Sequence, residues 1–311
     1  MKSEKILVTG GAGFIGSHLV ENLINQGHEL MVVDNLLSGK KQNIEHIISD
    51  NLFFDEIGSE EILKKVKHFN PDICFHLAAQ SSVVISVEDP MLDFEHNILQ
   101  PLQLIRTLLS TDCKKFVFSS SGGTIFGEPD IIPTSEIDFA GEPESPYGIS
   151  KKRLNEFIEL LFSNKENTTY SILNFSNVYG PRQDPHGEAG VVSIFTSKMM
   201  NNLEPTVFGD GEQTRDYIFV QDVVDALLLS STIDEDLFLN IGTGNETSVN
   251  DLVSTLKSTI GYLGEVKYEP KRDGELLRSV LDNSKAKKIL SWEPQYSLES
   301  GITELVNWLS A

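Results

Sequence analysis

The sequence Thr9-Gly10-Gly11-Ala12-Gly13-Phe14-Ile15-Gly16 joins a short apolar run, residues 6–8, to a helical pattern of apolar residues at positions 19, 23 and 24. Gly10 and Gly13 permit a tight turn and a close backbone approach to a ligand, and Gly16 permits close packing of helix on strand. The unpaired N–H groups at the start of a helix can bind a pyrophosphate. A glycine-rich loop alone is weak evidence, but this loop between strand and helix predicts a dinucleotide site.

Short apolar runs alternate with helical patterns along most of the chain, which predicts a parallel sheet with helices on both faces. The expected strands are residues 6–8, 30–33, 73–75, 116–118, 172–175 and 237–241. We therefore expect an α/β fold, a Rossmann-type doubly wound parallel sheet with a smaller αβ substrate-binding domain. The expected division is residues 1–176 and 217–242 for the dinucleotide-binding domain, and 177–216 and 243–311 for the substrate domain.

The composition is that of a globular protein, with 40% hydrophobic and 23% charged residues in a chain of 311. The net charge of −21 would repel nucleic acid and an anionic membrane, so neither is an expected partner. No apolar stretch reaches the ~20 residues of a membrane helix, and we expect a cytoplasmic protein. Cys74 and Cys113 fit no metal-ligand spacing, so we expect reduced structural thiols and no metal site.

Asp34 ends the second expected strand, eighteen residues after Gly16. A carboxylate at this position can accept hydrogen bonds from both ribose hydroxyls and repels a 2′-phosphate, which favours NAD over NADP. The alternative is that Asp34 only caps a turn before Asn35.

The glycine spacing resembles that of the extended short-chain dehydrogenase/reductase family, and further family motifs follow in order over nearly the whole chain. They are the run His76-Leu77-Ala78-Ala79-Gln80, Asn97, and the sugar-nucleotide segment at 174–182. The family's adenine-binding Asp corresponds to either Asp55 or Glu56. The resemblance implies NAD as cofactor, with contacts from Gly10, Gly13, Phe14, Ile15, Gly16, Asp34, Asn35, Ser38, Gly39, Asp55, Glu56, Ile57, Leu77, Ala78, Ala79, Gln80, Asn97, Tyr147 and Lys151.

Tyr147 and Lys151 are four residues apart and would share one face of a helix. A nearby cation favours the phenolate, which brings a group with an ordinary pKa of about 10 toward the value that a general base needs. Such a pair alone is more often a helix surface pair. The glycine loop upstream and the strand that ends in Ser119-Ser120-Ser121 favour a catalytic pair instead.

A third catalytic group would be a hydroxyl that binds the reacting oxygen and holds it against Tyr147. Ser121 is the first candidate, because the run Ser121-Gly122-Gly123 resembles a family variant with a hydroxyl residue before two glycines. Other members align the hydroxyl nearer Thr124, which is the second candidate.

Two segments, 208–217 and 272–275, look like those with which nucleotide-sugar members of the family hold the nucleoside diphosphate. Arg215 and Arg272 would bind the diphosphate, because a planar guanidinium binds phosphate oxygens in pairs. Glu275 would accept from a ribose hydroxyl, and by motif position Asn177 would contact the diphosphate or the sugar.

Ser279 is expected beside the 2-substituent of the sugar. In the epimerases that the chain resembles, a bulky residue here excludes an N-acetyl group and a small residue admits it. The alternative is that Ser279 simply begins a strand over residues 279–281.

The closest resemblance is to NAD-dependent nucleotide-sugar 4-epimerases that act on a UDP-hexose or a UDP-N-acetylhexosamine. It implies an isomerase in which Tyr147 takes the proton of the sugar 4-hydroxyl and a transient 4-keto sugar forms. A uronic-acid 4-epimerase, a 4,6-dehydratase or decarboxylase, and a non-catalytic dinucleotide sensor are the alternatives. Dehydration would need a further carboxylate where Gly122, Gly123 and Thr124 stand, and a sensor would not need Tyr147 and Lys151.

Two expected helices carry more apolar surface than one core requires. Leu154, Phe157, Ile158 and Leu161 form a stripe with helical spacing, and residues 91–109 are apolar on more than one side. We expect either a second layer of the chain over them or a homodimer contact through both helices.

Overall fold

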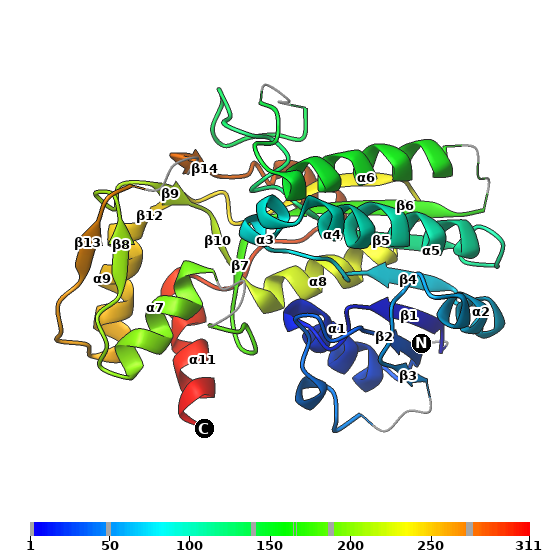
Figure 1. Ribbon diagram of the computed structural model, residues 1–311, viewed down its shortest axis with the longest axis horizontal. Coiled ribbons are helices and arrows are strands. Elements are labelled where there is room, and N and C mark those ends of the chain that lie inside the picture. The colour runs from blue at the N-terminus through cyan, green and yellow to red at the C-terminus, as the bar shows by residue number, and fades with distance from the viewer. Residues whose placement is uncertain are drawn as a thin grey trace.

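A seven-stranded parallel sheet forms the centre of the larger part of the molecule (Figure 1), in the order β11-β6-β5-β4-β1-β2-β3. The computed structural model describes residues 3–47, 51–137, 141–163, 165, 167–185, 190–271 and 276–311. The strands are β1 (Lys5–Thr9), β2 (Glu29–Val33), β3 (Leu52–Phe53), β4 (Ile73–His76), β5 (Lys115–Ser121), β6 (Thr169–Phe175) and β11 (Leu237–Ile241). This is the expected doubly wound sheet, and all six runs expected as strands lie in it.

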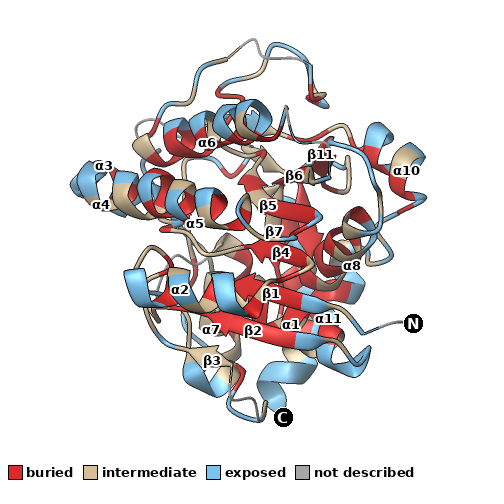
Figure 2. Cartoon of the chain, turned by 90° about the vertical axis from the view of Figure 1, so that its right-hand side faces the viewer, coloured by how far each residue is buried: buried red, intermediate tan, exposed pale blue. Residues whose placement is uncertain are grey.

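Helices cover both faces of the sheet because successive side chains of each strand point to opposite faces. Ile6 and Val8 pack with α1 (Phe14–Asn25), α8 (Val220–Ser231) and α10 (Ser284–Leu290). Leu7 packs on the other face with α2 (Glu60–Phe69), α5 (Gln100–Leu108) and α6 (Pro146–Phe162). Figure 2 shows the strands buried between these helices, whose outer faces are exposed.

The segment expected as one helix over residues 91–109 is helical but interrupted. It follows α3 (Val83–Glu88) and consists of α4 (Pro90–Phe94), a π-helical turn (Glu95–Leu99) and α5. Pro101 has no N–H to donate to the carbonyl four residues earlier, and the N–H of Gln100 donates to Glu95 O, five residues back. The wider turn thus accommodates the proline without breaking the helix.

The second, smaller unit is built from short strands and three helices. Its strands are β7 (Asn177–Tyr179), β8 (Thr206–Phe208), β9 (Thr214–Arg215), β10 (Tyr217–Phe219), β12 (Thr247–Ser248), β13 (Lys267–Glu269) and β14 (Arg278–Ser279). Its helices are α7 (Val191–Met200), α9 (Val249–Ile260) and α11 (Leu298–Ser310). They enclose a separate apolar core that includes Tyr179, Phe195, Leu252 and Ile302.

The chain crosses between the two units more often than the expected division has it. α10 lies in the stretch 243–311, yet Ala286, Leu290 and Trp292 belong to the core of the main sheet. β10 pairs with β7 in a two-stranded sheet, apart from the main one. The division at residues 176, 217 and 242 therefore stays a prediction.

Cys74 and Cys113 are both free and buried, as expected of structural thiols. Burial raises the pKa of Cys113 to about 12, which leaves it protonated near neutral pH. None of the described helices is long and apolar enough to cross a membrane.

Lys115 is a buried cation at the start of β5, with a side chain 2% exposed. Its ammonium donates to Ile233 O at 2.7 Å and Glu235 O at 2.8 Å, and lies 3.2 Å from Thr169 Oγ1. Lys115 therefore holds the segment after α8 against the start of strands β5 and β6.

Replacing Lys115 by Met should lower the free energy of unfolding by about 2–3 kcal/mol, because buried carbonyl oxygens lose a charged donor. Urea unfolding followed by circular dichroism measures the change. Lys114→Met is the matched control, since Lys114 is exposed and pairs with Asp72 at the surface, so its loss should cost less than about 0.5 kcal/mol. Equal effects of the two substitutions would contradict the anchoring role.

Candidate active site

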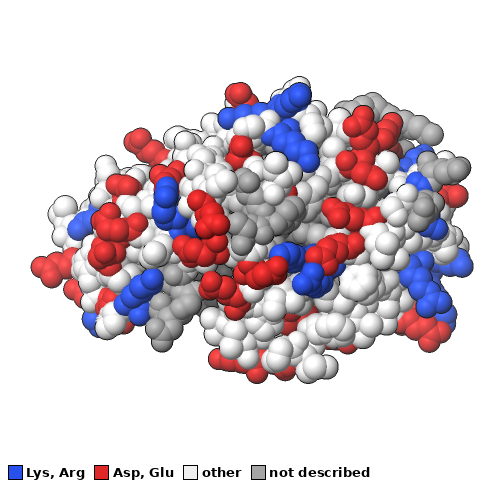
Figure 3. All heavy atoms as spheres, turned by 90° about the horizontal axis from the view of Figure 1, so that it is seen from above, with Lys and Arg blue, Asp and Glu red and all other residues white. Residues whose placement is uncertain are grey.

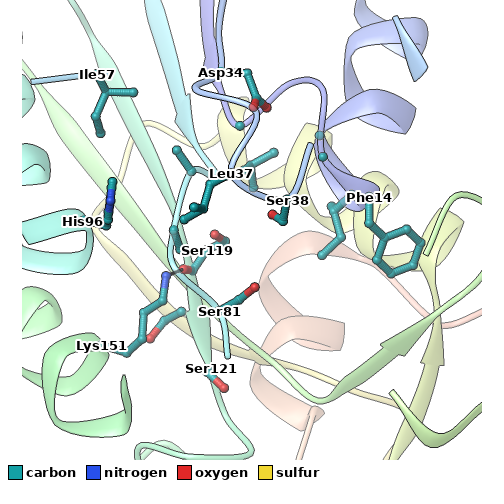
Figure 4. A pocket seen from close by; sticks show the side chains of 18 of the residues that line it. Phe14, Asp34, Leu37, Ser38, Ile57, Ser81, His96, Ser119, Ser121 and Lys151 are labelled. Carbon is teal, nitrogen blue, oxygen red and sulfur yellow. Dashed lines mark hydrogen bonds between the residues drawn. The ribbon is translucent and has the colours of Figure 1, made fainter. Parts of the chain in front are cut away.

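A cavity lies at the carboxyl ends of the central strands, beside β1. In the sheet, β1 lies between β2 and β4, and the strand order changes direction there. Ligands of doubly wound sheets bind at such a switch point. Figure 4 shows Asp34 at one side of this cavity, and Lys151 directed toward Ser119 at the other. The cavity is lined by Gly10, Gly13, Phe14, Ile15, Gly16, Asp34, Asn35, Leu37, Ser38, Glu56, Ile57, Leu77, Ala78, Ala79, Ser81, His96, Gln100, Ser119, Ser120, Ser121, Tyr147, Lys151, Phe175, Ser176 and Val178.

The glycine loop leaves the space and the donors that a dinucleotide needs. Gly10 has φ +72°, and a Cβ there would lie 2.6 Å from Ala78 N. A Cβ on Gly16 would collide with the Gly10 carbonyl. Gly13 caps α1 without a side chain, so the first N–H groups of the helix face the cavity unobstructed. The residues present therefore fit a pyrophosphate at this helix start.

Asp34 lies at the end of β2 and lines the cavity, 5% exposed. Its Oδ2 accepts from Ala12 N and its Oδ1 from Leu36 N, each at 2.8 Å. Burial raises the pKa of Asp34, and these backbone hydrogen bonds oppose the shift. Gly39 lies against the carboxylate, where a Cβ would come within 2.6 Å of Oδ1. Asp34 thus holds the turn and also presents a carboxylate to the cavity, where contact with a ribose stays a prediction.

The segment 55–57 divides between a structural and a cavity-lining role. Asp55 accepts from Glu56 N at 2.7 Å and from Ser59 Oγ at 3.1 Å, and does not line the cavity. Glu56 and Ile57 do line it, and Glu56 Oε1 accepts from Asn35 Nδ2 at 3.1 Å. Of the two residues expected to contact the adenine, Glu56 therefore lines the cavity and Asp55 does not.

Gln80 and Asn97, two expected cofactor contacts, lie behind the cavity wall. Both are 1% exposed, and the Asn97 side chain binds both the N–H and the carbonyl of Gln80. Leu77, Ala78 and Ala79 line the cavity as expected. The sequence interpretation missed several lining residues, among them Leu37, Ser81, His96 and Gln100, since nothing in their spacing distinguishes them.

The first turn of α6 brings Tyr147 to the cavity. Ser145 caps the helix, its Oγ accepting from Gly148 N at 3.2 Å, and Pro146 occupies the first turn, where a missing N–H costs nothing. Tyr147 is 8% exposed and lines the cavity together with Lys151, one turn further on. The expected pair is therefore on one face of a helix.

Lys151 is buried beside the phenol ring. Its ammonium donates to Ser119 O at 3.0 Å and lies 5.9 Å from the centre of the Tyr147 ring and 4.7 Å from that of Phe118. Burial lowers the pKa of Lys151 to about 8, and the negative charge of Asp93 opposes that shift. The lysine therefore remains mostly protonated near neutral pH, where its charge favours the Tyr147 phenolate.

The two hydroxyl candidates differ in placement. Ser121 ends β5 and lines the cavity on the same wall as Tyr147 and Lys151. Thr124 is outside the cavity lining, and its Oγ1 lies 3.4 Å from the Ser121 carbonyl, to which it donates. This placement favours Ser121.

The residues expected to hold the substrate gather beyond Ser121. A Cβ on Gly123 would lie 3.9 Å from Asn177 Oδ1 and 4.0 Å from Ser279 Oγ, so these side chains approach the same place. Ser279 and Arg215 are register partners on β14 and β9. Arg272 and Glu275 lie outside the described residues. On the face shown in Figure 3, Asp and Glu side chains are spread over the surface with Lys and Arg between them, in keeping with the net charge of −21.

Asp216 joins the two units next to this site, a role that the sequence interpretation missed. It is fully buried; its Oδ1 accepts from Thr243 N at 2.8 Å and Thr243 Oγ1 at 2.6 Å, and its Oδ2 from Gly244 N at 3.2 Å. Burial raises the pKa of Asp216, and these hydrogen bonds oppose the shift. It fixes the start of β10 beside Arg215.

Two ion pairs connect the segment after β7 to α1 and to the loop after β2. Lys40 pairs with Asp184 at 2.7 Å, and Arg182 pairs with Glu21 at 2.6 Å. Each pair joins a residue of the dinucleotide-binding part to one of the segment 181–185.

Comparison with known proteins gives matches over nearly the full length. A UDP-glucose 4-epimerase of Mycolicibacterium smegmatis is 39% identical over 308 residues, with 98% of both chains covered. The solved UDP-glucose 4-epimerase of Thermotoga maritima, with UDP-glucose, is 46% identical with a TM-score of 0.93, and 98% of both chains is covered. The UDP-N-acetylglucosamine 4-epimerase of Methanobrevibacter ruminantium, solved with UDP-N-acetylmuramic acid, is 33% identical with a TM-score of 0.93, covering 100% of this chain and 99% of that one.

These findings confirm both the fold class expected from the alternating pattern and the family resemblance. The model of the NAD dependent epimerase/dehydratase family matches residues 6–242, which is more than half of the chain. The chain therefore belongs to the NAD-dependent epimerase/dehydratase family.

Proposed function

We propose that this protein is an isomerase that inverts carbon 4 of a UDP-sugar with NAD as its cofactor. The observation that carries the proposal is that Tyr147, Lys151 and Ser121 line the same cavity as the glycine loop and Asp34. The relatives named above, which cover nearly the whole chain, are 4-epimerases of UDP-sugars. The test is incubation of the protein with UDP-glucose and separation of the products.

Tyr147 acts as the general base in this proposal. It takes the proton of the sugar 4-hydroxyl, and Lys151 stabilises the phenolate that receives it. Because Lys151 is held by Ser119 O, its charge stays fixed next to the ring throughout the reaction. Tyr147 returns the proton when the 4-keto sugar is reduced, so the pair ends the cycle as it began.

Ser121 holds the reacting oxygen against Tyr147 by a hydrogen bond. NAD bound in this cavity would supply the hydride acceptor, and in its reduced form the hydride donor, for carbon 4. The chain supports this inversion by leaving room near Ser121 at Gly123, where a Cβ would meet no atom closer than 3.9 Å. The sugar can therefore turn between the two steps while the nucleotide stays bound.

Arg215, Asn177 and Ser279 bind the UDP-sugar in this proposal. Arg215 supplies positive charge for the diphosphate, and Asn177 and Ser279 contact the sugar; the approach of both side chains to Gly123, and the pairing of Ser279 with Arg215, support this assignment. Arg272 and Glu275 are further candidates for the diphosphate and a ribose hydroxyl.

The alternatives find less support. Residues 119–127 contain no carboxylate, which a dehydratase or decarboxylase would need beside the strand-end hydroxyl. A dinucleotide sensor would have no use for a buried lysine held against a phenol ring. A uronic-acid 4-epimerase differs only in the sugar. Product analysis with a UDP-uronic acid in place of UDP-glucose distinguishes the two.

We further propose a cytoplasmic homodimer, in keeping with two free, buried thiols. Val84 of α3, Met91 of α4 and Leu160 of α6 are 66%, 72% and 68% exposed. Arg153 and Glu156 pair within the same apolar surface, at 2.6 Å. A second copy related by a two-fold axis would offer the same apolar surface and the opposite charge to each of these two residues.

Asp34→Ala should weaken NAD binding by about 1.5–3 kcal/mol, because the ribose hydroxyls lose a charged acceptor. Asp34→Asn should keep one of the two backbone hydrogen bonds, through its remaining acceptor oxygen, but lose the repulsion of a 2′-phosphate. Isothermal calorimetry with NAD and NADP measures both. Wild-type protein that binds NADP as tightly as NAD would contradict the role of Asp34.

Tyr147→Phe should lower turnover roughly 100-fold or more, within the range of a general acid–base group, while the fold and the bound NAD are retained. Product formation from UDP-glucose measures it. Near-normal turnover would exclude Tyr147 as the base. If Thr124→Val loses turnover while Ser121→Ala keeps it, the hydroxyl role belongs to Thr124.

Ser279→Tyr should abolish epimerisation of UDP-N-acetylglucosamine and spare UDP-glucose, because a bulky ring clashes with the N-acetyl group only. Ser279→Ala, which stays small, should accept both sugars. Chromatography of the products measures the ratio. Wild-type protein inert toward N-acetylhexosamines but active on UDP-glucose would refute the assignment.

A further inference from the structure

Asp93 is a fully buried carboxylate near the proposed catalytic pair, and the mechanism above does not use it. The hydrogen bonds that the described residues give it come from neutral groups. Ser150 Oγ donates to Oδ2 at 2.6 Å, while Asn97 Nδ2 and Gln80 Nε2 donate to Oδ1 at 2.7 and 3.1 Å. A buried charge without a cation in contact is costly, so the position calls for an explanation beyond packing.

Asn97 and Gln80 connect Asp93 to the cavity wall. Asn97 lies in the π-helical turn, and its side chain binds the backbone of Gln80 through both of its polar atoms, at 2.8 and 3.1 Å. Gln80 directly follows Leu77, Ala78 and Ala79, which line the cavity. By holding Asn97 and the Gln80 side chain, Asp93 fixes the course of this wall.

Ser150 connects Asp93 to α6, the helix that carries Tyr147 and Lys151. Ser150 precedes Lys151 on α6, so the hydrogen bond to Ser150 holds the carboxylate against the turn that carries the lysine. Asp93 is also the charge that opposes the loss of the proton from Lys151, whose burial lowers its pKa to about 8.

The other titratable groups around the pair do not supply this charge. His76 faces Lys151 from β4, but burial and the lysine charge lower the pKa of His76 to about 3, so it is neutral. On the turn after α4, Glu95 accepts from Gln100 and His96 lies 3.6 Å from Glu56.

The carboxylates of Glu88 and Asp89, at the end of α3, are exposed to solvent. Arg153 and Glu156, further along α6, pair with each other at the surface. Solvent screens these groups far more than it screens a buried carboxylate.

We propose that Asp93 is a positioning residue for the reaction, whose buried negative charge keeps Lys151 protonated beside Tyr147 while its hydrogen bonds hold the 77–80 wall in place. The inference rests on the proposed function. Removal of the charge makes deprotonation of both Lys151 and Tyr147 easier. The pH window in which Tyr147 is a phenolate and Lys151 a cation therefore moves to lower pH.

Asp93→Asn tests the charge with the shape retained, since its oxygen can still accept from Gln80 and Asn97 and its amide can donate to Ser150. Both limbs of the pH profile of kcat should move to lower pH by about 0.5–1 unit, the alkaline limb further, because Lys151 feels the charge more strongly. Asp93→Ser, which leaves room for a water, gives the same test if the asparagine variant fails to fold. Limbs that stay at the wild-type pH would overturn the proposal, even if kcat itself falls.

Two controls separate charge from structure. Ser150→Ala removes a hydrogen bond but keeps the carboxylate, so its limbs should stay near the wild-type pH. Asp89→Asn removes an exposed carboxylate four residues earlier that accepts from Leu92 N as a helix cap, and asparagine caps equally well. A shift in Asp89→Asn as large as that in Asp93→Asn would also refute the proposal.

A measurement without turnover keeps this inference separate from the proposed function. The phenolate absorbance of the protein is titrated with and without Tyr147→Phe, and the difference gives the titration of Tyr147 alone. This difference curve should move to lower pH in the Asp93→Asn background. If the wild-type protein fails to epimerise UDP-sugars but the curve moves, the proposed function fails and the effect of Asp93 stands; an unmoved curve refutes the effect itself.

Discussion

The contact between the glycine loop and the loop after β4 sets the geometry on which the rest of the site depends. At Gly10 the backbone has a positive φ and runs so close to Ala78 that no side chain fits. This approach places the start of α1 next to the ends of β4 and β5, so the donors for a pyrophosphate and the Tyr147 wall face one cavity. A larger residue at position 10 would separate the two halves of the site.

Buried carboxylates hold the segments that the sheet itself does not order. Asp34 accepts from the turn after β2, Asp216 from the loop after β11, and Asp222 from the backbone of Gln295 and Tyr296. In each case N–H groups without partners in a helix or strand are satisfied by a short acidic side chain. The acidic composition is thus partly structural and does not only keep the surface solvated.

Local patterns predicted the sheet, the glycine loop, Asp34 and the Tyr147–Lys151 pair, because each depends on spacing along a single strand or helix. The network of Gln80, Asp93, Asn97 and Ser150 could not be predicted, since its members come from a loop and three helical elements and their polar groups resemble surface residues in the sequence. β3 has two residues, too few for a periodic pattern. Asn97 was expected to contact the cofactor because of its family position, whereas the π-helical turn aims it at Gln80.

The strand trio β12-β9-β14 has a consequence for the order in which the protein forms during synthesis. It unites residues 214–215, 247–248 and 278–279, and β14 is the last strand of the chain. Strands β1 to β6 can pair once the first 175 residues have left the ribosome, whereas the Arg215 and Ser279 side chains meet only when nearly the whole chain is made. Nascent chains therefore acquire the nucleotide-cofactor half of the pocket first, and the sugar half is completed last.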